Sequence, residues 1–210
     1  MRASSTRRGF TLIELMVVVA IVGVLAVLAS FGVRRYLADA KVAEATNMVG
    51  KISGLAAEAY EADRGSVSLL GGGGSSSART KKLCGSSTQV PANVNMVANR
   101  KYQPNPRTDY DALSADNNQY IGWKCLRFEN SQPQYYAYVY RADQGISPLT
   151  GGSAIVGAPP PALAGVNPWN ACASGDLNGD GKTSLICHGG VIVAKKPVTM
   201  TQVYMSSPEE

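Results

Sequence analysis

The stretch that decides the fold is residues 7–16, RRGFTLIELM, where a short basic leader runs into an apolar segment. Residues 15–33 carry no charged side chain, and a helix of that length spans about 28 Å, close to the thickness of a bilayer core. One acid, Glu14, lies near the start of this segment. A carboxylate at the edge of such a segment is expensive in lipid, so Glu14 is a candidate functional residue that requires a partner charge.

The residues alone allow three interpretations of this segment. A secretory signal peptide fits the small residues at 27–29, VLA, but a charge such as Glu14 is disfavoured inside its apolar region. A plain membrane anchor fits the length and the hydropathy, yet it gives Glu14 no role. A buried core helix is the least favoured, because the segment is long and uncharged. The basic residues on its two sides are nearly balanced and do not fix its orientation.

Composition sets the rest of the chain apart from this segment. The chain has 20 Lys+Arg against 15 Asp+Glu, and three of the cations are arginines of the first nine residues. The basic balance therefore does not indicate a nucleic-acid surface. The 22 Gly and 11 Pro are typical of a turn-rich, mostly β body. Four Cys in a chain that begins like an exported protein indicate disulfides formed in an oxidising compartment.

The six residues 9–14, GFTLIE, resemble the processing signature of type IV pilins and of the related type II secretion pseudopilins. The resemblance covers roughly residues 7–60. It implies that a prepilin peptidase cuts between Gly9 and Phe10 and methylates the new amine of Phe10. It also implies that Glu14 is the assembly residue, paired with the Phe10 amine of a neighbouring subunit in the apolar core of a filament.

The resemblance implies an α+β fold in which a long N-terminal helix packs on an antiparallel sheet of about four strands. We expect a cleaved leader at 1–9, a transmembrane and filament-core helix at 10–33, and an amphipathic continuation at 34–64. A variable, Gly/Ser-rich region is expected at 65–118, and the sheet with a disulfide-bonded C-terminal region at 119–210.

The expected function is that of a structural subunit of a type IV pilus that serves motility, adhesion or DNA uptake. Its expected partners are further pilins, the prepilin peptidase, the assembly platform and the inner membrane, and its final location is the extracellular pilus. A minor pilin or pseudopilin that primes or caps the fibre is the alternative within the family. Many major pilins have a Pro near the end of the apolar run, whereas residues 28–33 read LASFGV.

A ligand- or DNA-binding adhesin is the alternative from another class. The basic residues Arg79, Lys81 and Lys82 after the Gly/Ser-rich loop could contact DNA or another anionic polymer, although a solvated loop is the more common reason for such a cluster. An enzyme is not expected, because the one histidine, His188, directly follows Cys187. Neighbours in a strand point to opposite faces and cannot act together as nucleophile and base.

Periodicity predicts how the helix meets the sheet. The apolar stripe Met48, Ile52, Leu55 and Ala59, preceded by Leu37 and Ala40, should pack on the sheet, and the helix should stop at residues 63–65. Strands are predicted at 120–128, 134–141, 191–194 and 198–204. Alternation puts Tyr136, Tyr138 and Tyr140 on one face, either packed against the helix or forming a stacking platform for a ligand.

Residues 176–184, DLNGDGKTS, resemble the first half of a calcium loop. Asp176, Asn178, Asp180 and Ser184 are the candidate metal ligands. The twelfth position is Cys187, where an EF-hand has a bidentate Glu, so a polar β-turn is favoured and no cofactor is expected. Calcium remains the alternative.

The same turn predicts the disulfides. A hairpin centred on Gly179-Asp180 places Cys172 opposite Cys187, within disulfide reach. Cys84 and Cys125 then pair by elimination.

Overall fold

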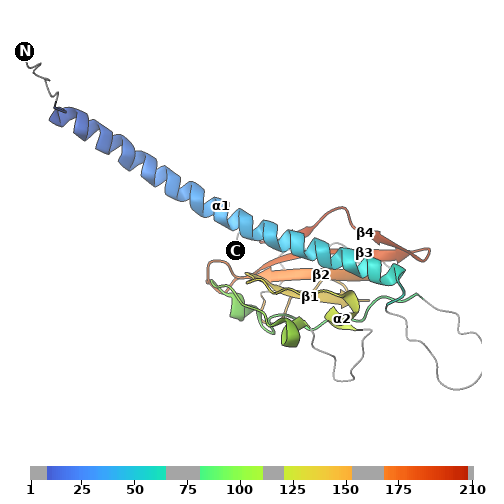
Figure 1. Cartoon of the computed structure of the whole chain (residues 1–210). Helices are drawn as coiled ribbons and strands as arrows, with labels where there is room; N and C mark the ends of the chain where they lie inside the picture. The colour runs from blue at the N-terminus through green and yellow to red at the C-terminus, as the bar shows by residue number, and fades with distance from the viewer. Residues whose placement is uncertain (1–8, 65–80, 111–120, 153–167, 208–210) are drawn as a thin grey trace, which may run out of the picture. The chain divides into compact units, whose positions relative to one another are not determined.

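A computed structural model describes residues 9–64, 81–110, 121–152 and 168–207 (Figure 1). The chain forms two compact units, Met1–Ala40 and Lys41–Glu210, which are described separately below. Residues 65–80 and 111–118 of the expected Gly/Ser-rich region lie outside the described residues, as do residues 119–120 and 153–167 of the expected C-terminal region.

The first unit is built on helix α1, Leu12–Glu61, which continues into the second unit. Its first part is apolar on every side, and side chains from Phe10 to Val33 are exposed. The absence of Pro allows the helix to run without interruption. By length and composition α1 is able to cross a membrane.

In the second unit the last turns of α1 bury one narrow face. Its fully buried residues follow the helical period of four and three, and they are Ala45, Val49, Ile52, Ala56 and Ala59. Of the predicted stripe, Ile52 and Ala59 lie on this face, whereas Met48 and Leu55 are half-buried at its border. Leu37 is 52% exposed and Ala40 is exposed. The stripe was predicted about one residue out of phase, since alanines carry little hydrophobic signal.

The helix ends where the sequence predicts. Asp63 has a positive φ of 58°, its N–H donates to the carbonyl of Tyr60, and the N–H of Arg64 donates to the carbonyl of Ala59, as in a Schellman motif. The guanidinium of Arg64 also pairs with Glu58 on the last turn.

The sheet is antiparallel and has five strands. The strands are β1 (Ala137–Ala142), β2 (Pro168–Gly175), β3 (Ser184–Val193), β4 (Lys196–Thr199) and β5 (Tyr204–Ser206). Their order is β1-β2-β3-β4, and β5 pairs with the first part of β3. The helix and the antiparallel sheet confirm the expected α+β fold. The run predicted as one strand at 198–204 is divided between β4 and β5, and β3 begins well before residue 191.

One face of the sheet packs against α1 (Figure 1). Tyr136, Tyr138 and Tyr140 all lie on this face and are fully buried in one cluster with the buried residues of α1. The indole N–H of Trp169 on β2 donates to the hydroxyl of Ser53 on α1 at 3.1 Å. The tyrosine row therefore packs against the helix. Its interpretation as a stacking platform is wrong, because no ligand can reach fully buried rings.

The other face of the sheet is covered by a short 3₁₀-helix, η1 (Val94–Val97), and by Leu149. Val94, Val97 and Leu149 pack there against Ala137 and Val139, which alternate with the tyrosines along β1. The sheet therefore has an apolar layer on each side, and β1 and β2 are buried throughout most of their length.

The strand predicted at 120–128 is wrong, because these residues include a short helix, α2 (Gly122–Leu126). Gly122 has a φ of +67°, which turns the chain out of the extended conformation. Lys124 is exposed between buried residues on both sides, and Cys125 and Leu126 are buried together, which a strand with one covered face does not allow. A five-residue π-helix, η2 (Pro106–Tyr110), is the remaining helix that the structure describes.

We expect the second unit to unfold in alkali because of its buried tyrosines. Burial raises the pKa of Tyr136 to about 12 and also raises the pKa of Tyr138 and Tyr140 above the usual value near 10. The folded state therefore holds these protons more tightly than the unfolded state. The free energy of unfolding should be insensitive to these groups below about pH 10 and fall as the pH rises through about 12. Circular dichroism followed against pH measures this loss.

Replacing one buried hydroxyl tests the cause. Tyr136→Phe should make the alkaline transition less steep, whereas Tyr36→Phe, which changes a tyrosine that is 73% exposed, should leave it unchanged. Ultraviolet absorbance that shows all tyrosines ionising near pH 10 in the folded protein would contradict this explanation.

Candidate functional sites

The bond between Gly9 and Phe10 lies just before α1 begins, in chain without regular secondary structure. Both residues are exposed, and the ring of Phe10 is 90% exposed. A Cβ added at Gly9 would meet no atom within 4 Å, so nothing in the fold requires glycine at this position. The Gly9–Phe10 bond is therefore exposed in this structure.

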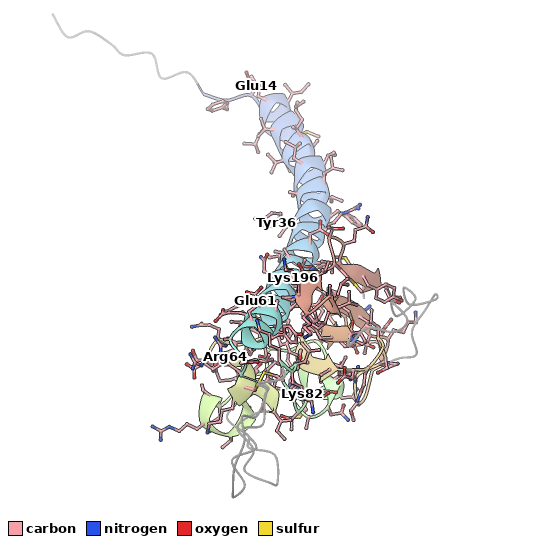
Figure 2. The ribbon with its side chains drawn as sticks, turned by 90° about the vertical axis from the view of Figure 1, so that its right-hand side faces the viewer. Glu14, Tyr36, Glu61, Arg64, Lys82 and Lys196 are labelled. Atoms are coloured by element: carbon pink, nitrogen blue, oxygen red, sulfur yellow. A yellow bond between two sulfur atoms is a disulfide. The ribbon has the colours of Figure 1, made fainter. Side chains whose placement is uncertain are left out.

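Glu14 lies in the first turn of α1 (Figure 2). It forms a reciprocal pair of hydrogen bonds with Thr11, the residue that precedes the helix. Its Oε2 accepts the N–H of Thr11 and the Thr11 hydroxyl, each at 2.8 Å. The hydroxyl oxygen of Thr11 in turn accepts the N–H of Glu14 at 3.3 Å. This arrangement is a capping box, which fixes the position of the carboxylate at the start of the helix.

The capping box leaves the negative charge of Glu14 uncompensated. Both donors from Thr11 are neutral, and no described residue forms an ion pair with this carboxylate. The second oxygen, Oε1, has no hydrogen-bond donor among the described residues. A cation from outside the chain could therefore bind a carboxylate that is already oriented.

Thr11 was not predicted as a helix-capping residue, although the sequence contains the signal. Residues 11–14, TLIE, match the pattern S/T-x-x-E that marks a helix N-terminus before an apolar run. The pattern identifies Thr11 together with Glu14, and Thr11 is the residue that positions the carboxylate.

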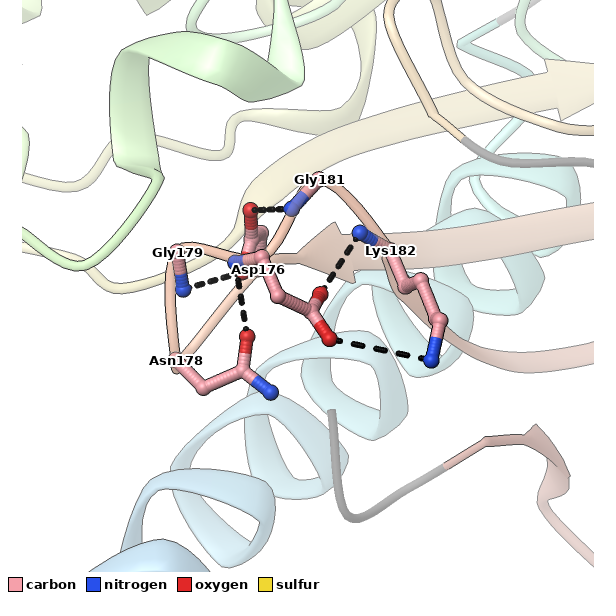
Figure 3. Close-up of polar contacts among 6 residues, drawn as sticks. Asp176, Asn178, Gly179, Gly181 and Lys182 are labelled. Atoms are coloured by element: carbon pink, nitrogen blue, oxygen red, sulfur yellow. Dashed lines mark hydrogen bonds and ion pairs between the residues drawn. The ribbon is translucent and has the colours of Figure 1, made fainter.

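The loop at residues 176–182 is held by hydrogen bonds of its own side chains (Figure 3). Asp176 is buried, and its two carboxylate oxygens accept the N–H groups of Gly179 at 2.6 Å and Gly181 at 3.0 Å. Asn178 accepts the N–H of Asp180, and Asp180 accepts the N–H of Lys182. Each acidic or amide side chain thus stabilises the backbone of the turn, as in Asx-turns.

This geometry is a poor match to a calcium site. Ser184 lies in β3, where it is buried and its hydroxyl donates to the carbonyl of Gly175 at 3.0 Å. The ammonium of Lys182 lies 3.8 Å from the carboxylate of Asp180, so a cation of the protein already lies beside this candidate ligand. Calcium takes six to eight oxygens. Within the residues described, no group of three or more His, Cys, Asp or Glu side chains could hold a metal ion.

We expect calcium to have little effect on stability, and Asp176 to have a large one. Asp176→Ala should remove two hydrogen bonds to a charged acceptor and lower the free energy of unfolding by about 2–4 kcal/mol, whether calcium or a chelator is present. Asp180→Ala, at an exposed position of the same turn, is the matched control and should cost less than about 1 kcal/mol. Thermal unfolding with and without calcium makes the comparison. A rise in melting temperature with calcium that Asp180→Ala removes would establish a metal site instead.

All four cysteines are bonded in the structure, Cys84 to Cys125 and Cys172 to Cys187. Cys172 and Cys187 are directly opposite in the register of β2 and β3, three residue pairs before the closed end of the hairpin that carries the 176–182 loop. Cys84–Cys125 ties α2 to the chain that follows the basic residues Lys81 and Lys82. Peptide mapping of the purified protein would test both pairings.

His188 has a structural contact and no nucleophile beside it. Its Nε2 lies 2.8 Å from the carbonyl oxygen of Met200, between β3 and the end of β4. The adjacent Cys187 is bonded to Cys172 and is not a thiol. This pair cannot perform nucleophilic catalysis.

Comparison with known proteins gives two matches, and each covers only part of the chain. Residues 4–30 match the family model of the prokaryotic N-terminal methylation motif. The chain is also similar to the fimbrial protein EcpC of Eikenella corrodens, with 44% identity over 59 residues, which are 28% of this chain. The chain spans 38% of the length of that relative. No solved structure matches the chain. The matches point to a structural protein.

Proposed function

The chain has the N-terminal methylation motif and the pilin-like architecture of the type IV pilin superfamily, and on that premise we propose that it is a structural subunit of a type IV pilus. One observation carries this proposal. At the start of an exposed apolar helix, Thr11 orients a carboxylate, that of Glu14, whose charge no described residue compensates. Such a group is costly in an apolar environment unless a cation arrives.

The cation is the amine that cleavage creates. A peptidase cut between Gly9 and Phe10 removes leader 1–9 and frees the amine of Phe10. In the filament, the amine of one subunit binds the Glu14 carboxylate of the next, while the apolar residues up to 33 form the core. Before assembly the same helix holds the chain in the inner membrane. Its continuation, residues 34–64, extends into the second unit, which forms the head of the subunit.

The test is the N-terminus of the protein recovered from fibres sheared off the cell surface. We expect mass spectrometry to find a mature chain that begins at methylated Phe10. The accessible bond ahead of α1 and the motif over residues 4–30 are the reasons. A chain that begins at Ser30 would show an ordinary signal peptide, and recovery only from membranes would show an anchor that does not assemble.

A minor pilin or pseudopilin that primes or caps the fibre is the second candidate. The observation in its favour is that α1 runs unbroken from Leu12 to Glu61, with Gly and no Pro at residues 28–33. Copy number in purified fibres separates the two functions, because a structural subunit is the main component and a primer is present in few copies.

A further inference from the structure

The second unit contains a cavity with a positively charged rim, and none of its lining residues belongs to the proposed processing and assembly site. It has a volume of about 520 Å³ and lies between η2 and α2. Its lining residues come from these two elements and from the chain just after α2, and they are Pro106, Arg107, Tyr110, Trp123, Lys124, Arg127, Phe128 and Glu129. The cavity is therefore built by segments that sequence analysis did not identify as a site.

Three packed rings make the floor of the cavity rigid. Tyr110 and Trp123 meet edge to face with centroids 5.3 Å apart, and Phe128 lies 5.4 Å from Tyr110 and 5.2 Å from Trp123. The hydroxyl of Tyr110 donates to buried Gln134 at 2.7 Å. A floor fixed by ring packing, a buried hydrogen bond and the nearby disulfide of Cys125 is already formed before any ligand arrives.

The rim of the cavity has three cations and one acid. Arg107, Lys124 and Arg127 are exposed, and Glu129 is the acid. Among the described residues, neither Arg107 nor Arg127 forms an ion pair. Like charges gathered around one depression repel one another, and an anion placed among them would relieve that repulsion.

The chemistry of the rim points to an oxyanion and not to a stacked base. Tyr110, Trp123 and Phe128 are only 1–3% exposed, so their faces cannot stack on a nucleobase. Guanidinium groups bind phosphate through two parallel hydrogen bonds, and cations from two different elements can surround a tetrahedral group. A planar carboxylate with one charge would pair with fewer of these cations.

The disulfide brings further cations near this rim. Lys82 is exposed and precedes Cys84 by two residues, and the Cα atoms of Cys84 and Cys125 are 5.8 Å apart. Since consecutive Cα atoms are at most 3.8 Å apart, the Cα of Lys82 lies within about 17 Å of that of Lys124. A ligand with several phosphates in a row could contact both.

We propose that this cavity binds the phosphate groups of a sugar-phosphate ligand through Arg107 and Arg127. The backbone of duplex DNA and a free sugar phosphate share this chemistry, and the experiment separates them. The proposal does not depend on assembly into a fibre.

The experiment measures binding of a fluorescein-labelled DNA duplex of random sequence to the full chain in detergent micelles, by anisotropy at several salt concentrations. Arg107→Gln and Arg127→Gln should each weaken binding about tenfold, equivalent to about 1.4 kcal/mol. Each should also reduce the slope of log K against log salt by about 1. Arg100→Gln is the matched control, since Arg100 is exposed and lies outside the cavity lining.

Two competitors identify the ligand. If ribose 5-phosphate displaces the duplex only weakly, the ligand is a nucleic-acid backbone. If ribose 5-phosphate binds tightly and the duplex binds weakly, the cavity is assigned to free sugar phosphates. Polygalacturonate that competes as well as DNA would overturn the preference for phosphate. Equal losses in Arg100→Gln and Arg107→Gln would overturn the site itself.

A folding defect is excluded by the design. Arg127 has a φ of 55°, so Arg127→Lys, which keeps the charge in the same conformation, should retain more affinity than Arg127→Gln. Near-ultraviolet circular dichroism, which reports the packing of Trp123, should be the same for all variants. Binding that is lost equally in Arg127→Lys and Arg127→Gln, with an altered spectrum, leaves Arg107→Gln to decide the proposal.

Discussion

Glu14→Val should leave the head folded and the chain in the membrane, but absent from surface fibres. The substitution removes a polar group from an apolar segment, so insertion should be as good as in the unchanged protein. In the fibre, the neighbour's amine would be buried without its partner, which costs about 3–5 kcal/mol at each subunit contact. The measurement is the fraction of the protein in sheared fibres against the fraction in membranes.

Two further variants separate charge from shape. Glu14→Gln keeps the size and the acceptor oxygen for Thr11 but loses the charge, so it should assemble nearly as poorly as Glu14→Val. Thr11→Val keeps the charge and removes the hydroxyl that orients it, so it should assemble to an intermediate level. Glu14→Val found in fibres at the normal level would show that the carboxylate is not an assembly group.

The second large effect is expected at the processing site, where Gly9→Val should leave the precursor uncut. The added side chain meets open space in the folded protein, so any loss of processing reports the peptidase and not the fold. Leader 1–9 would then remain, the amine of Phe10 would stay in a peptide bond, and fibres would not form. Mass spectrometry of the membrane fraction measures the retained leader.

A second glycine serves as the control for this variant. Gly23→Val changes another position with open space around its Cβ, further along α1, and it should be processed normally. If Gly9→Val is also cut at Phe10, the peptidase assignment is wrong.

The parts of the fold that sequence predicted well depend on local rules. The hairpin register follows from the turn at Gly179-Asp180, because equal distances along two strands put Cys172 opposite Cys187. The row Tyr136, Tyr138 and Tyr140 follows from alternation along one strand, and only its burial separates helix packing from ligand stacking. These inferences need only the alternation of side chains between the two faces of a strand.

The parts that sequence did not predict depend on tertiary context. The run 120–128, YIGWKCLRF, contains Tyr, Ile, Trp and Phe, which favour strands, but Gly122 at positive φ starts a short helix inside it. The contact face of α1 is formed by small residues such as Ala45 and Ala56, whose burial depends on the sheet that approaches them. The cavity beside α2 could not be predicted, since it joins Arg107 to Arg127 across a stretch with no periodic pattern.

The order in which the head can fold follows from where its last strand comes from. α1 requires only hydrogen bonds between residues four apart, so it can form before the rest of the chain is present. The sheet, in contrast, closes late, because β5 at Tyr204–Ser206 pairs with β3 and Trp169 contacts Ser53 across 116 residues. Contacts this distant in sequence form slowly. The first part of β3 therefore has an open edge until β5 pairs with it, and removal of Tyr204–Ser206 would leave that edge free to pair with another chain.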